Sequence, residues 1–372
     1  MKIKFWLVMV FGCVLGSHAF AEAGVSAKEI VIGQSAAFSG ASGALGTHLK
    51  AGAEAYFKIV NEAGGVNGRK IRLVALDDAY EPARAEKNTR ELIEKENVFA
   101  LFGYVGTATS NAAMPIFSEA RVPFIGPYSG AESLRKPFNR YIFNIRASYI
   151  DETAMIVDYL KPQGLKRVGV LYQNDAYGQA GLQGVEQAMS KHGAAPLVKA
   201  TIERNSTDVA KAVATISAAK PDAVVIVSAY KGSAAFIREM KKVLPTVNFW
   251  NVSFVGSNEL RDELKEDGYG VAISQVVPFP WSDAVNVAKE HRQAMDGKQS
   301  FTSLEGFIAA KVLVEGLKRA GKEPTRESFV AALENASKMD VGGFAVSFSP
   351  KSHNGSTFVD LSIISGNGKF IR

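Results

Sequence analysis

Residues 103–135 read GYVGTATSNAAMPIFSEARVPFIGPYSGAESLR, and this stretch contains one arrangement twice. In each copy a short apolar run ends in small and hydroxyl-bearing residues, and a helix-like stretch follows. The first turn holds Gly106-Thr107 and the second holds Tyr128-Ser129-Gly130. In an open α/β sheet, ligands bind beyond the carboxyl ends of the strands, where loops lead into helices. We therefore expect two neighbouring strands whose turns line one concave, polar spot.

The first of these turns has the chemistry of an anion site. The beginning of a helix offers free N–H groups and a partial positive charge, which suit a carboxylate. The hydroxyls of Thr107 and Ser110 can donate hydrogen bonds to the same group. The alternative is that Thr107, Thr109 or Ser110 only caps its own helix. The pattern of residues favours neither the anion site nor the helix cap.

Strand-like and helical segments alternate on both sides of this stretch. EIVIGQSA precedes a helix that we expect to run from about Gly46 to Gly64-Gly65, and the alternation begins again after RYIFNIRAS. Such alternation indicates right-handed crossovers and mostly parallel sheets. A chain of 372 residues is long for one core. The sequence therefore predicts an α/β protein of two lobes, joined by ordered strands because no Pro/Gly/Ser-rich linker separates them.

Residues 1–21 are interpreted as a secretion signal and not as part of the fold. Two lysines precede an apolar run from Phe5 to Gly16, and the stretch Ala19-Phe20-Ala21 supplies the small residues of a cleavage site. The apolar run is too short for a stable membrane span. A lipoprotein anchor at Cys13 is the alternative, which we favour less because the apolar run continues past it.

The composition argues against several classes of protein. Cys13 is the only cysteine, so we expect no disulfide and no thiolate metal site beyond residue 21. The 43 basic and 37 acidic residues are mixed along the chain, which disfavours nucleic-acid binding. No metal-binding, phosphate-binding or nucleophile motif occurs, so neither a cofactor nor a catalytic centre is expected. Asp77-Asp78 closes a strand, and we favour a structural loop role for this pair.

Four aromatic residues fall at the ends of predicted strands: Tyr128, Tyr177, Tyr230 and Phe254. Each could wall a small-molecule pocket by packing against apolar ligand surface. Local packing at a lobe edge explains any one of them equally well. Arg146, in a strand expected to cross between the lobes, could bind a carboxylate or only pack between the lobes.

Taken together, these stretches resemble the type I periplasmic solute-binding proteins of ABC transporters, in the branched-chain amino acid (Leu/Ile/Val) binding group. The resemblance runs from about Ile30 to the C-terminus, and its carriers include IGQSAAFSGASGALG, NEAGGVNGRKIRLVALDD, NDAYGQAGLQGV, SQVVPFPW and the stretch 103–135. It implies two Rossmann-like lobes that close like a clamshell and are joined by three crossovers near residues 145, 276 and 345. The N-terminal lobe would comprise 22–145 plus 277–345, and the C-terminal lobe 146–276 plus 346–372.

The resemblance also implies a set of ligand contacts. The turn at Gly106-Thr107 would hold a carboxylate, the turn at 128–130 would add contacts, and Tyr177 would cover the ligand from the second lobe. The implied contact residues are Gly106, Thr107, Tyr128, Ser129, Gly130, Tyr177, Tyr230, Ser253 and Phe254.

One departure from the family pattern bears on the ligand. Ser253 falls where the amino-acid binders have an acid that pairs with the α-ammonium group, and Leu45 replaces a larger polar aromatic residue. The nearest carboxylate, Glu259, is expected to point elsewhere on its helix. A buried ammonium group without a partner costs several kcal/mol. A carboxylate with an apolar or aromatic body, or a neutral amide, therefore rivals an amino acid, and leucine should bind less well than its des-amino analogue.

The resulting hypothesis is a secreted, monomeric, non-enzymatic binding protein without a cofactor. It would capture a small carboxylate-bearing solute by closing its lobes and deliver it to the permease subunits of an ABC transporter in the inner membrane. One alternative is a ligand-sensing periplasmic receptor for a partner signalling protein. A second alternative is an enzyme on a doubly wound fold, which the lack of a catalytic constellation disfavours.

Overall fold

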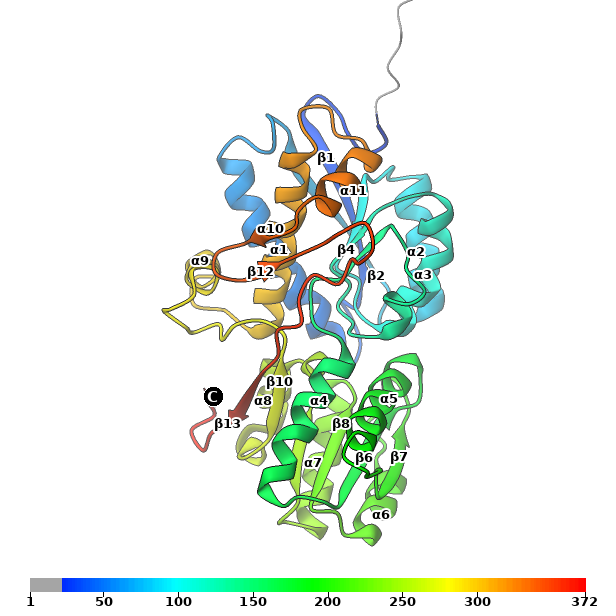
Figure 1. Cartoon of the computed structure of the whole chain (residues 1–372), viewed down its shortest axis with the longest axis vertical. Coiled ribbons are helices and arrows are strands. Elements are labelled where there is room, and N and C mark those ends of the chain that lie inside the picture. The colour runs from blue at the N-terminus through cyan, green and yellow to red at the C-terminus, as the bar shows by residue number, and fades with distance from the viewer. Residues whose placement is uncertain (1–21) are drawn as a thin grey trace, which may run out of the picture.

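The computed structural model describes residues 22–372, and these form two lobes that follow one another along the long axis of the molecule (Figure 1). Each lobe is an α/β unit built around its own sheet. The predicted secretion signal and Cys13 lie outside the described residues. Within the described range, none of the helices combines the length and the apolar character that a membrane crossing requires.

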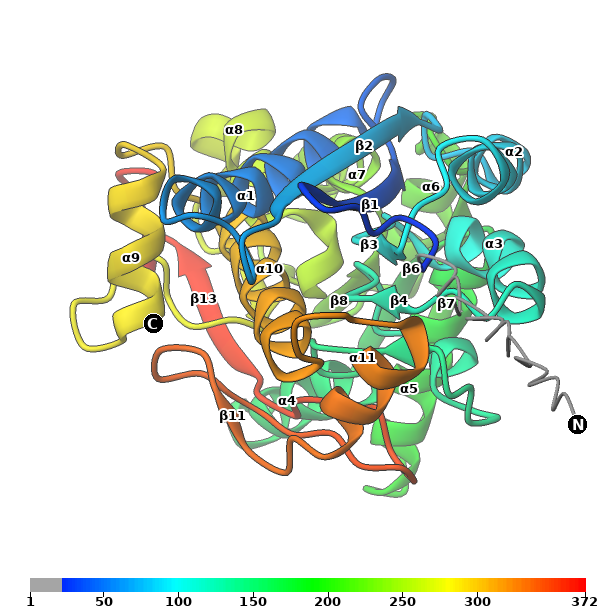
Figure 2. The same ribbon diagram turned by 90° about the horizontal axis from the view of Figure 1, so that it is seen from above.

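The sheet of the first lobe is entirely parallel and has the strand order β2-β1-β3-β4-β5. Its strands are β1 (Glu29–Ala36), β2 (Lys70–Asp77), β3 (Ala100–Phe102), β4 (Phe124–Ile125) and β5 (Ile142–Phe143). The helices of this lobe are α1 (Gly43–Glu62), α2 (Pro82–Glu94), α3 (Thr107–Glu119), α9 (Asn286–Ala294), α10 (Phe301–Arg319) and α11 (Arg326–Glu334). Seen from above, α1 and α10 lie on one side of the sheet and α2 and α3 on the other (Figure 2).

The sheet of the second lobe has seven strands in the order β14-β13-β10-β9-β8-β6-β7. Its strands are β6 (Val168–Gln173), β7 (Val198–Ile202), β8 (Ala223–Val227), β9 (Asn248–Asn251), β10 (Ala272–Gln275), β13 (Asp360–Ile364) and β14 (Phe370–Ile371). Only β13 and β14 run antiparallel to their neighbours. The helices are α4 (Tyr149–Leu160), α5 (Ala176–Ser190), α6 (Ala210–Ala219), α7 (Tyr230–Val243) and α8 (Ser257–Leu264). The predicted α/β fold with mostly parallel sheets is therefore confirmed.

The chain passes from one sheet to the other three times. The first passage follows β5 and the second follows β10, close to the expected residues 145 and 276. The third differs from the prediction at 345. The short hairpin β11 (Met339–Asp340) with β12 (Ala345–Val346) is followed by a segment that still bonds to the first lobe, since the amide of Gly355 donates to the carbonyl of Asn144. The chain enters the second sheet only at β13, because this segment extends the edge beside β5 first.

Two local expectations were wrong. The helix predicted from about Gly46 begins at Gly43. The helix expected after the turn at 128–130 is only the single 3-10 turn η1 (Glu132–Leu134). Pro137 explains the short turn, because a residue that precedes a proline is driven away from helical dihedral angles.

A close crossing of α1 and α10 fixes the position of the cleft-facing end of α10. A Cβ at Gly52 would lie 1.8 Å from the backbone oxygen of Ser303, and one at Gly306 would lie 2.0 Å from that of Leu49. Only glycine at both positions permits this backbone contact. The crossing holds Glu305, the neighbour of Gly306, at the junction of the lobes.

Candidate ligand site between the lobes

The first predicted turn joins β3 to α3 and leaves the start of that helix without a side-chain cap. Gly106 has a φ of 108°, and a Cβ there would lie 2.4 Å from the ring of Tyr80, so a side chain does not fit. Helix α3 begins at Thr107. The first N–H groups of a helix have no acceptor within it and carry a partial positive charge. The turn therefore presents donors that suit an anion.

The second predicted turn lies beside the first because β3 and β4 are neighbours in the sheet. A bridge pairs Val105 with Tyr128, and the hydroxyls of Thr107 and Ser129 lie 2.8 Å apart. The predicted polar spot thus has one hydroxyl from each turn. Gly130 lies against the start of α4, where its carbonyl accepts a hydrogen bond from the amide of Tyr149.

The hydroxyls at the start of α3 do not act as caps. A capping hydroxyl accepts a hydrogen bond from a backbone amide of its helix. Thr109 instead donates to the carbonyls of Val105 and Gly106, and no side chain caps the start of α3. The buried hydroxyl of Ser110 has no hydrogen-bond partner. The capping alternative is therefore not what the structure shows, and the free amides of α3 keep their donor capacity.

Phe254 lies at the centre of a group of buried rings drawn from both lobes. Its ring centroid is 4.3 Å from that of Tyr177, 5.3 Å from Tyr128 and 6.0 Å from Tyr80. The hydroxyls of Tyr177 and Tyr149 are buried without a hydrogen-bond partner. Because these rings are in contact, a solute in this region lies alongside Phe254 or displaces it. Tyr80 and Tyr149 were missed by the sequence analysis, although a signal was present, since Tyr80 closely follows the strand that Asp77-Asp78 closes and Tyr149 directly follows the segment RYIFNIRAS.

Tyr230 lies apart from the group of rings around Phe254. It is the first residue of α7, it is buried, and it is not a member of the ring group around Phe254 among the described residues. Leu45 faces the second lobe, where it would touch a Cβ at Gly256. Leu45 therefore lies at the lobe interface, and the phenol of Tyr230 lies within hydrogen-bonding reach of the backbone of Ala44 in the same helix α1.

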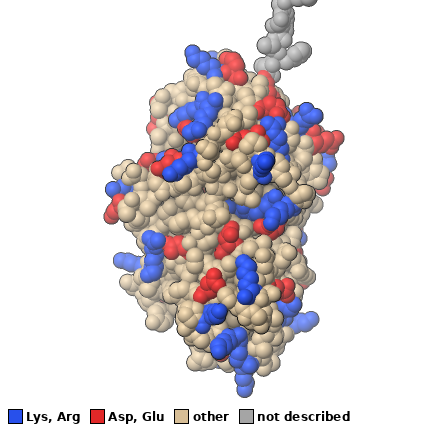
Figure 3. Space-filling view, viewed as in Figure 1, with Lys and Arg blue, Asp and Glu red and all other residues tan. Residues whose placement is uncertain are grey.

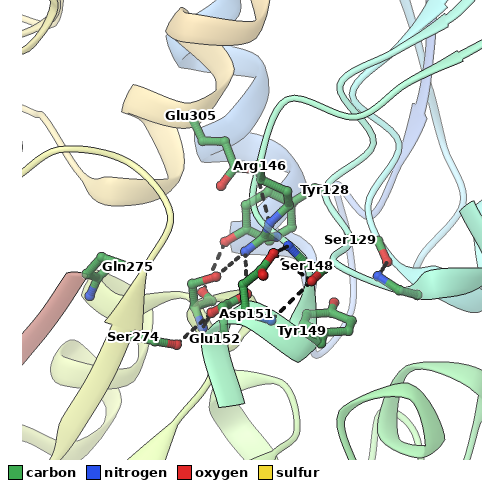
Figure 4. A network of polar contacts seen from close by, with 12 residues as sticks. Tyr128, Ser129, Arg146, Ser148, Tyr149, Asp151, Glu152, Ser274, Gln275 and Glu305 are labelled. Carbon is green, nitrogen blue, oxygen red and sulfur yellow. Dashed lines mark hydrogen bonds and ion pairs between the residues drawn. The ribbon is translucent and has the colours of Figure 1, made fainter. Parts of the chain in front are cut away.

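Arg146, Glu152 and Glu305 form a buried group of charges at the junction of the lobes, which we call the central charge cluster (Figure 4). Arg146 comes from the first crossing segment, just after β5, whereas Glu152 comes from α4 and Glu305 from α10. The guanidinium lies 3.5 Å from a carboxylate oxygen of Glu305 and 3.6 Å from one of Glu152. The same guanidinium lies over the ring of Tyr128, 4.7 Å from its centroid.

The environment shifts the pKa values within this cluster. Burial raises the pKa of Glu305 to about 7, with Glu152 adding to the rise and Arg146 opposing it. Burial disfavours the charge on Arg146, but Glu305 and Glu152 outweigh that effect and raise the pKa of Arg146. The arginine is therefore charged, and Glu305 changes its charge near neutral pH.

Ser253 is held by groups of the protein itself. Its amide donates to a carboxylate oxygen of Glu152 at 2.7 Å, and Arg146 donates to its hydroxyl. Its carbonyl accepts a long bond of 3.4 Å from the hydroxyl of Tyr128. Ser253 thus joins the central charge cluster to the second predicted turn. Sequence reasoning singled out Ser253 and Arg146 separately, but no spacing in the chain indicated that they meet.

Glu259 has partners that the sequence analysis did not name. Its carboxylate crosses to the first lobe, where it pairs with His48 of α1 and accepts from Thr302 of α10 at 3.3 Å. The hydrogen bond with Glu259 raises the pKa of His48, although partial burial opposes the rise. This ion pair links the two lobes at the rim of the site.

Asp77 and Asp78 stabilise loops, as expected. Asp77 accepts from the amides of Phe38 and Ala79, and Asp78 accepts from the hydroxyl of Ser35. Among residues 22–372, no three histidine, cysteine, aspartate or glutamate side chains are grouped as metal ligands would be. On the face shown in Figure 3, basic and acidic side chains are interspersed and no broad basic surface is present.

The structure has two α/β lobes, and polar groups from both lobes are buried against each other around an uncapped helix start. This arrangement defines a class of binding proteins that close on a solute. The chain matches the periplasmic binding protein family over residues 29–366, and it belongs to that family.

Relatives agree with this assignment. The chain is 34% identical to a possible leucine/isoleucine/valine-binding protein from Rhodopirellula baltica, whose crystal structure superimposes with a TM-score of 0.88 over 93% of this chain and 96% of that one. It is 23% identical to Leu/Ile/Val-binding protein homolog 3 of Brucella melitensis over 91% of both chains. It is 25% identical to an amino acid binding protein of Pseudomonas aeruginosa, but this match spans only 66% of this chain and 64% of the relative. The names of these relatives are those of binding proteins, as is the name of the family to which this chain belongs.

Proposed function

We propose that the protein is the solute-binding component of an ABC transporter, which takes up a small carboxylate-bearing solute between its lobes and delivers it to a permease. The observation that carries this proposal is the uncapped start of α3 beside the Thr107–Ser129 hydroxyl pair. Buried hydroxyls without partners, on Ser110, Tyr149 and Tyr177, add further polar capacity around the same region. An anionic group of a solute would satisfy several of these donors at once.

The proposal extends to the contacts and to the cellular location. Gly106, Thr107, Ser129 and Gly130 would hold the carboxylate end of the solute from the first lobe. Tyr128, Tyr177, Tyr230, Ser253 and Phe254 would surround its remainder. Residues 1–21 would direct export to the periplasm, where the protein would act as a monomer.

A ligand screen tests the binding proposal. Amino acids, aromatic acids, short keto and fatty acids and amides are added to the purified protein, and the melting temperature is measured. A solute that binds only the folded state raises that temperature. At a solute concentration of a hundred times its Kd, the free energy of unfolding increases by roughly 2.7 kcal/mol. Mass spectrometry of the bound solute after incubation should return it unchanged. If every compound leaves the melting temperature where it was, the proposal is wrong.

Delivery to a permease needs a second measurement. Intact cells with and without the gene are compared for uptake of the labelled solute that the screen identifies. We expect the deletion strain to lose high-affinity uptake and to regain it when the gene is restored. Equal uptake by both strains would contradict a role in transport while leaving solute binding intact.

A further inference from the structure

Two loops of different lobes meet at the rim that lies away from the passages of the chain between the sheets. The passages leave β5 and β10 and enter at β13, whereas β2 and β7 form the opposite edges of the two sheets. In the second lobe, β7 and β13 lie on opposite sides of the molecule (Figure 1). The loops that follow β2 and β7 are bonded to each other, and we call this contact the distal latch (residues 79–81 with 204–205). Groups far from a hinge separate most when the lobes open.

The side chain of Asn205 makes hydrogen bonds to three groups of the other lobe. Its amide nitrogen donates to the carboxylate of Glu81 at 2.8 Å and to the carbonyl of Ala79 at 3.3 Å. Its amide oxygen accepts from the hydroxyl of Ser42 at 3.2 Å. All the hydrogen bonds that the structure shows for this side chain therefore cross between the lobes.

Glu81 is available to the second lobe because its carboxylate does not serve its own helix. It occupies the N-cap position of α2, but its side chain makes no capping bond. Its carboxylate instead accepts from Asn205 and lies 3.7 Å from the guanidinium of Arg204. Arg204 also donates a long bond of 3.4 Å to the carbonyl of Tyr80. Both residues of the β7 loop thus bind the same turn of the first lobe.

This turn of the first lobe has an unusual backbone. Ala79 and Tyr80 have φ values of 50° and 67°, and such left-handed conformations are uncommon for residues other than glycine. The carboxylates of Asp77 and Asp78 accept from the amides of Ala79 and Tyr80 at 2.9 and 2.8 Å. Asn205 therefore meets a turn whose shape the first lobe itself determines.

Tyr80 connects the distal latch to the candidate solute site. Its ring lies over Gly106, where an added Cβ would come within 2.4 Å of it, and its centroid is 6.0 Å from that of Phe254. Its hydroxyl accepts a bond of 3.2 Å from Gln173 of the second lobe. The distal latch thus holds the backbone of a residue whose ring covers the start of α3.

Resting on the proposed function, we propose that Asn205 is a positioning residue, which latches the lobes in the closed arrangement and keeps Tyr80 over the start of α3 without touching the solute. The bonds of the distal latch form only when the lobes meet, so they stabilise the closed form and not the open form. Removing bonds at an interface acts mainly on the rate at which it separates. The distal latch therefore sets how long each closed event lasts and, with it, how long a solute is retained.

Single-molecule fluorescence tests the distal latch in the solute-free protein. Dyes are attached at Lys87→Cys on α2 and at Lys211→Cys on α6, two exposed positions on different lobes. Cys13 is the only native cysteine, and its replacement by serine makes the labelling specific. The efficiency of energy transfer between the dyes reports the fraction of time spent closed and the duration of each closed event.

Asn205→Gly removes the side chain and keeps the backbone conformation, since Asn205 has a φ of 59° that glycine adopts freely. Asn67→Gly is the matched control, because Asn67 has a φ of 50° and its amide donates to the carbonyl of Gly321 within the first lobe. Closed events should become about ten-fold shorter in Asn205→Gly, because three hydrogen bonds between the lobes are lost. They should keep their duration in Asn67→Gly.

A reversed pair separates the bond itself from other effects of the substitution. Asn205→Asp places a carboxylate against that of Glu81, so it should also shorten the closed events. Adding Glu81→Gln to Asn205→Asp places an amide donor against a carboxylate again, and the closed events should lengthen. Equal durations in the wild type and Asn205→Gly, or no recovery in the double variant, would overturn the inference. These measurements need no solute, so failure of every compound in the thermal screen would reject the proposed function and leave the test of the distal latch intact.

Discussion

Several polar atoms in the cleft are buried without a partner, and these atoms define the site at the scale of single residues. The hydroxyls of Ser110, Tyr149 and Tyr177 belong to this set, together with two nitrogens of Arg146. Leaving such an atom unpaired costs about 1–3 kcal/mol. Most buried polar groups in native proteins have a hydrogen-bond partner. Several buried polar atoms without a partner, gathered between two lobes, therefore indicate a place where a solute completes the hydrogen bonds.

Thr107→Ala tests the contribution of the turn at the start of α3 to solute binding. The change removes the hydroxyl that pairs with Ser129, and it should weaken solute binding by about 1–3 kcal/mol because a bond to a charged group is lost. Isothermal titration measures the effect with whichever solute the screen identifies. Thr89→Ala is the control, since Thr89 is a buried threonine bonded to Ala85 and Tyr104 within the first lobe. Equal affinity in the wild type and Thr107→Ala would remove Thr107 from the site.

Tyr177→Phe tests the contribution of the second lobe. The change deletes only a buried hydroxyl that has no partner, so the solute-free protein should keep or slightly increase its stability. Solute affinity should fall if this hydroxyl bonds the solute, by roughly 0.5–1.5 kcal/mol for a neutral hydrogen bond. Tyr104→Phe provides the contrast, because it removes a hydroxyl that is already paired with Thr89 and should lower stability without changing affinity. A loss of stability with full affinity in Tyr177→Phe would contradict the assignment.

At the scale of elements, the crossing of α1 with α10 decides where Glu305 of the central charge cluster lies. Gly52 and Gly306 bring the two helix backbones into contact, and Glu305 projects from α10 next to that contact. On the opposite side, the capping box of Ser148 with Asp151 starts α4 immediately after the first crossing segment. That start places Glu152 in the first turn of α4, where it faces Arg146.

Gly306→Ala tests the helix crossing. Alanine favours a helix over glycine by about 1 kcal/mol, but the added Cβ would lie 2.0 Å from the backbone oxygen of Leu49. A backbone atom cannot move aside as a flexible side chain can, so we expect a net destabilisation of about 1–3 kcal/mol. Urea unfolding measures it, with the exposed Lys318→Ala on the same helix as the control. Equal or greater stability of Gly306→Ala would show that the helices can separate freely.

At the scale of the whole molecule, the lobes are closed on one another through contacts between side chains of both. Gln173 donates to the hydroxyl of Tyr80 at 3.2 Å, and His48 pairs with Glu259 across the rim of the site. These contacts, further hydrogen bonds between the lobes such as those of the Asn205 side chain with Ser42 and Glu81, and the rings around Phe254 hold the closed arrangement. A hinge motion that separates the lobes would break them and expose the site.

The pair of His48 with Glu259 makes closure sensitive to pH. Its hydrogen bond to Glu259 raises the pKa of His48 above the usual 6.5, so the closed form binds the proton more tightly than the open or unfolded form. The stabilisation is fully present below pH 6.5 and is lost as the pH rises through the raised pKa of His48. His48 is partly exposed, and the effect should therefore be small.

His48→Gln isolates this contribution. Melting temperatures of the wild type and the variant are compared between pH 5.5 and 8.5, and the difference between the two cancels the titration of other groups. We expect the advantage of the wild type to be greatest at the acidic end and to shrink as the pH rises. A constant difference over the whole range would show that the proton on His48 does not stabilise the closed form.

The sequence by itself determined which segments form strands and helices, and which polar side chains stand at the turns between them. The alternation of apolar runs with amphipathic stretches predicted two α/β lobes, because each strand and helix buries a face whose period is visible in the local sequence. The stretch 103–135 predicted two adjoining turns with hydroxyls, because consecutive parallel strands end at the same edge of a sheet. These inferences depend only on neighbours along the chain.

Only the tertiary structure decided which distant charges meet. Arg146 comes from a crossing segment and Glu152 and Glu305 come from two helices. Glu259 reaches His48 across the lobe boundary. Their meeting depends on the glycine crossing of α1 with α10 and on the course of the chain through its three passages between the sheets. No local period encodes such long-range pairing, since the free energy of a buried charge is set by the groups around it in space and not by its neighbours in sequence.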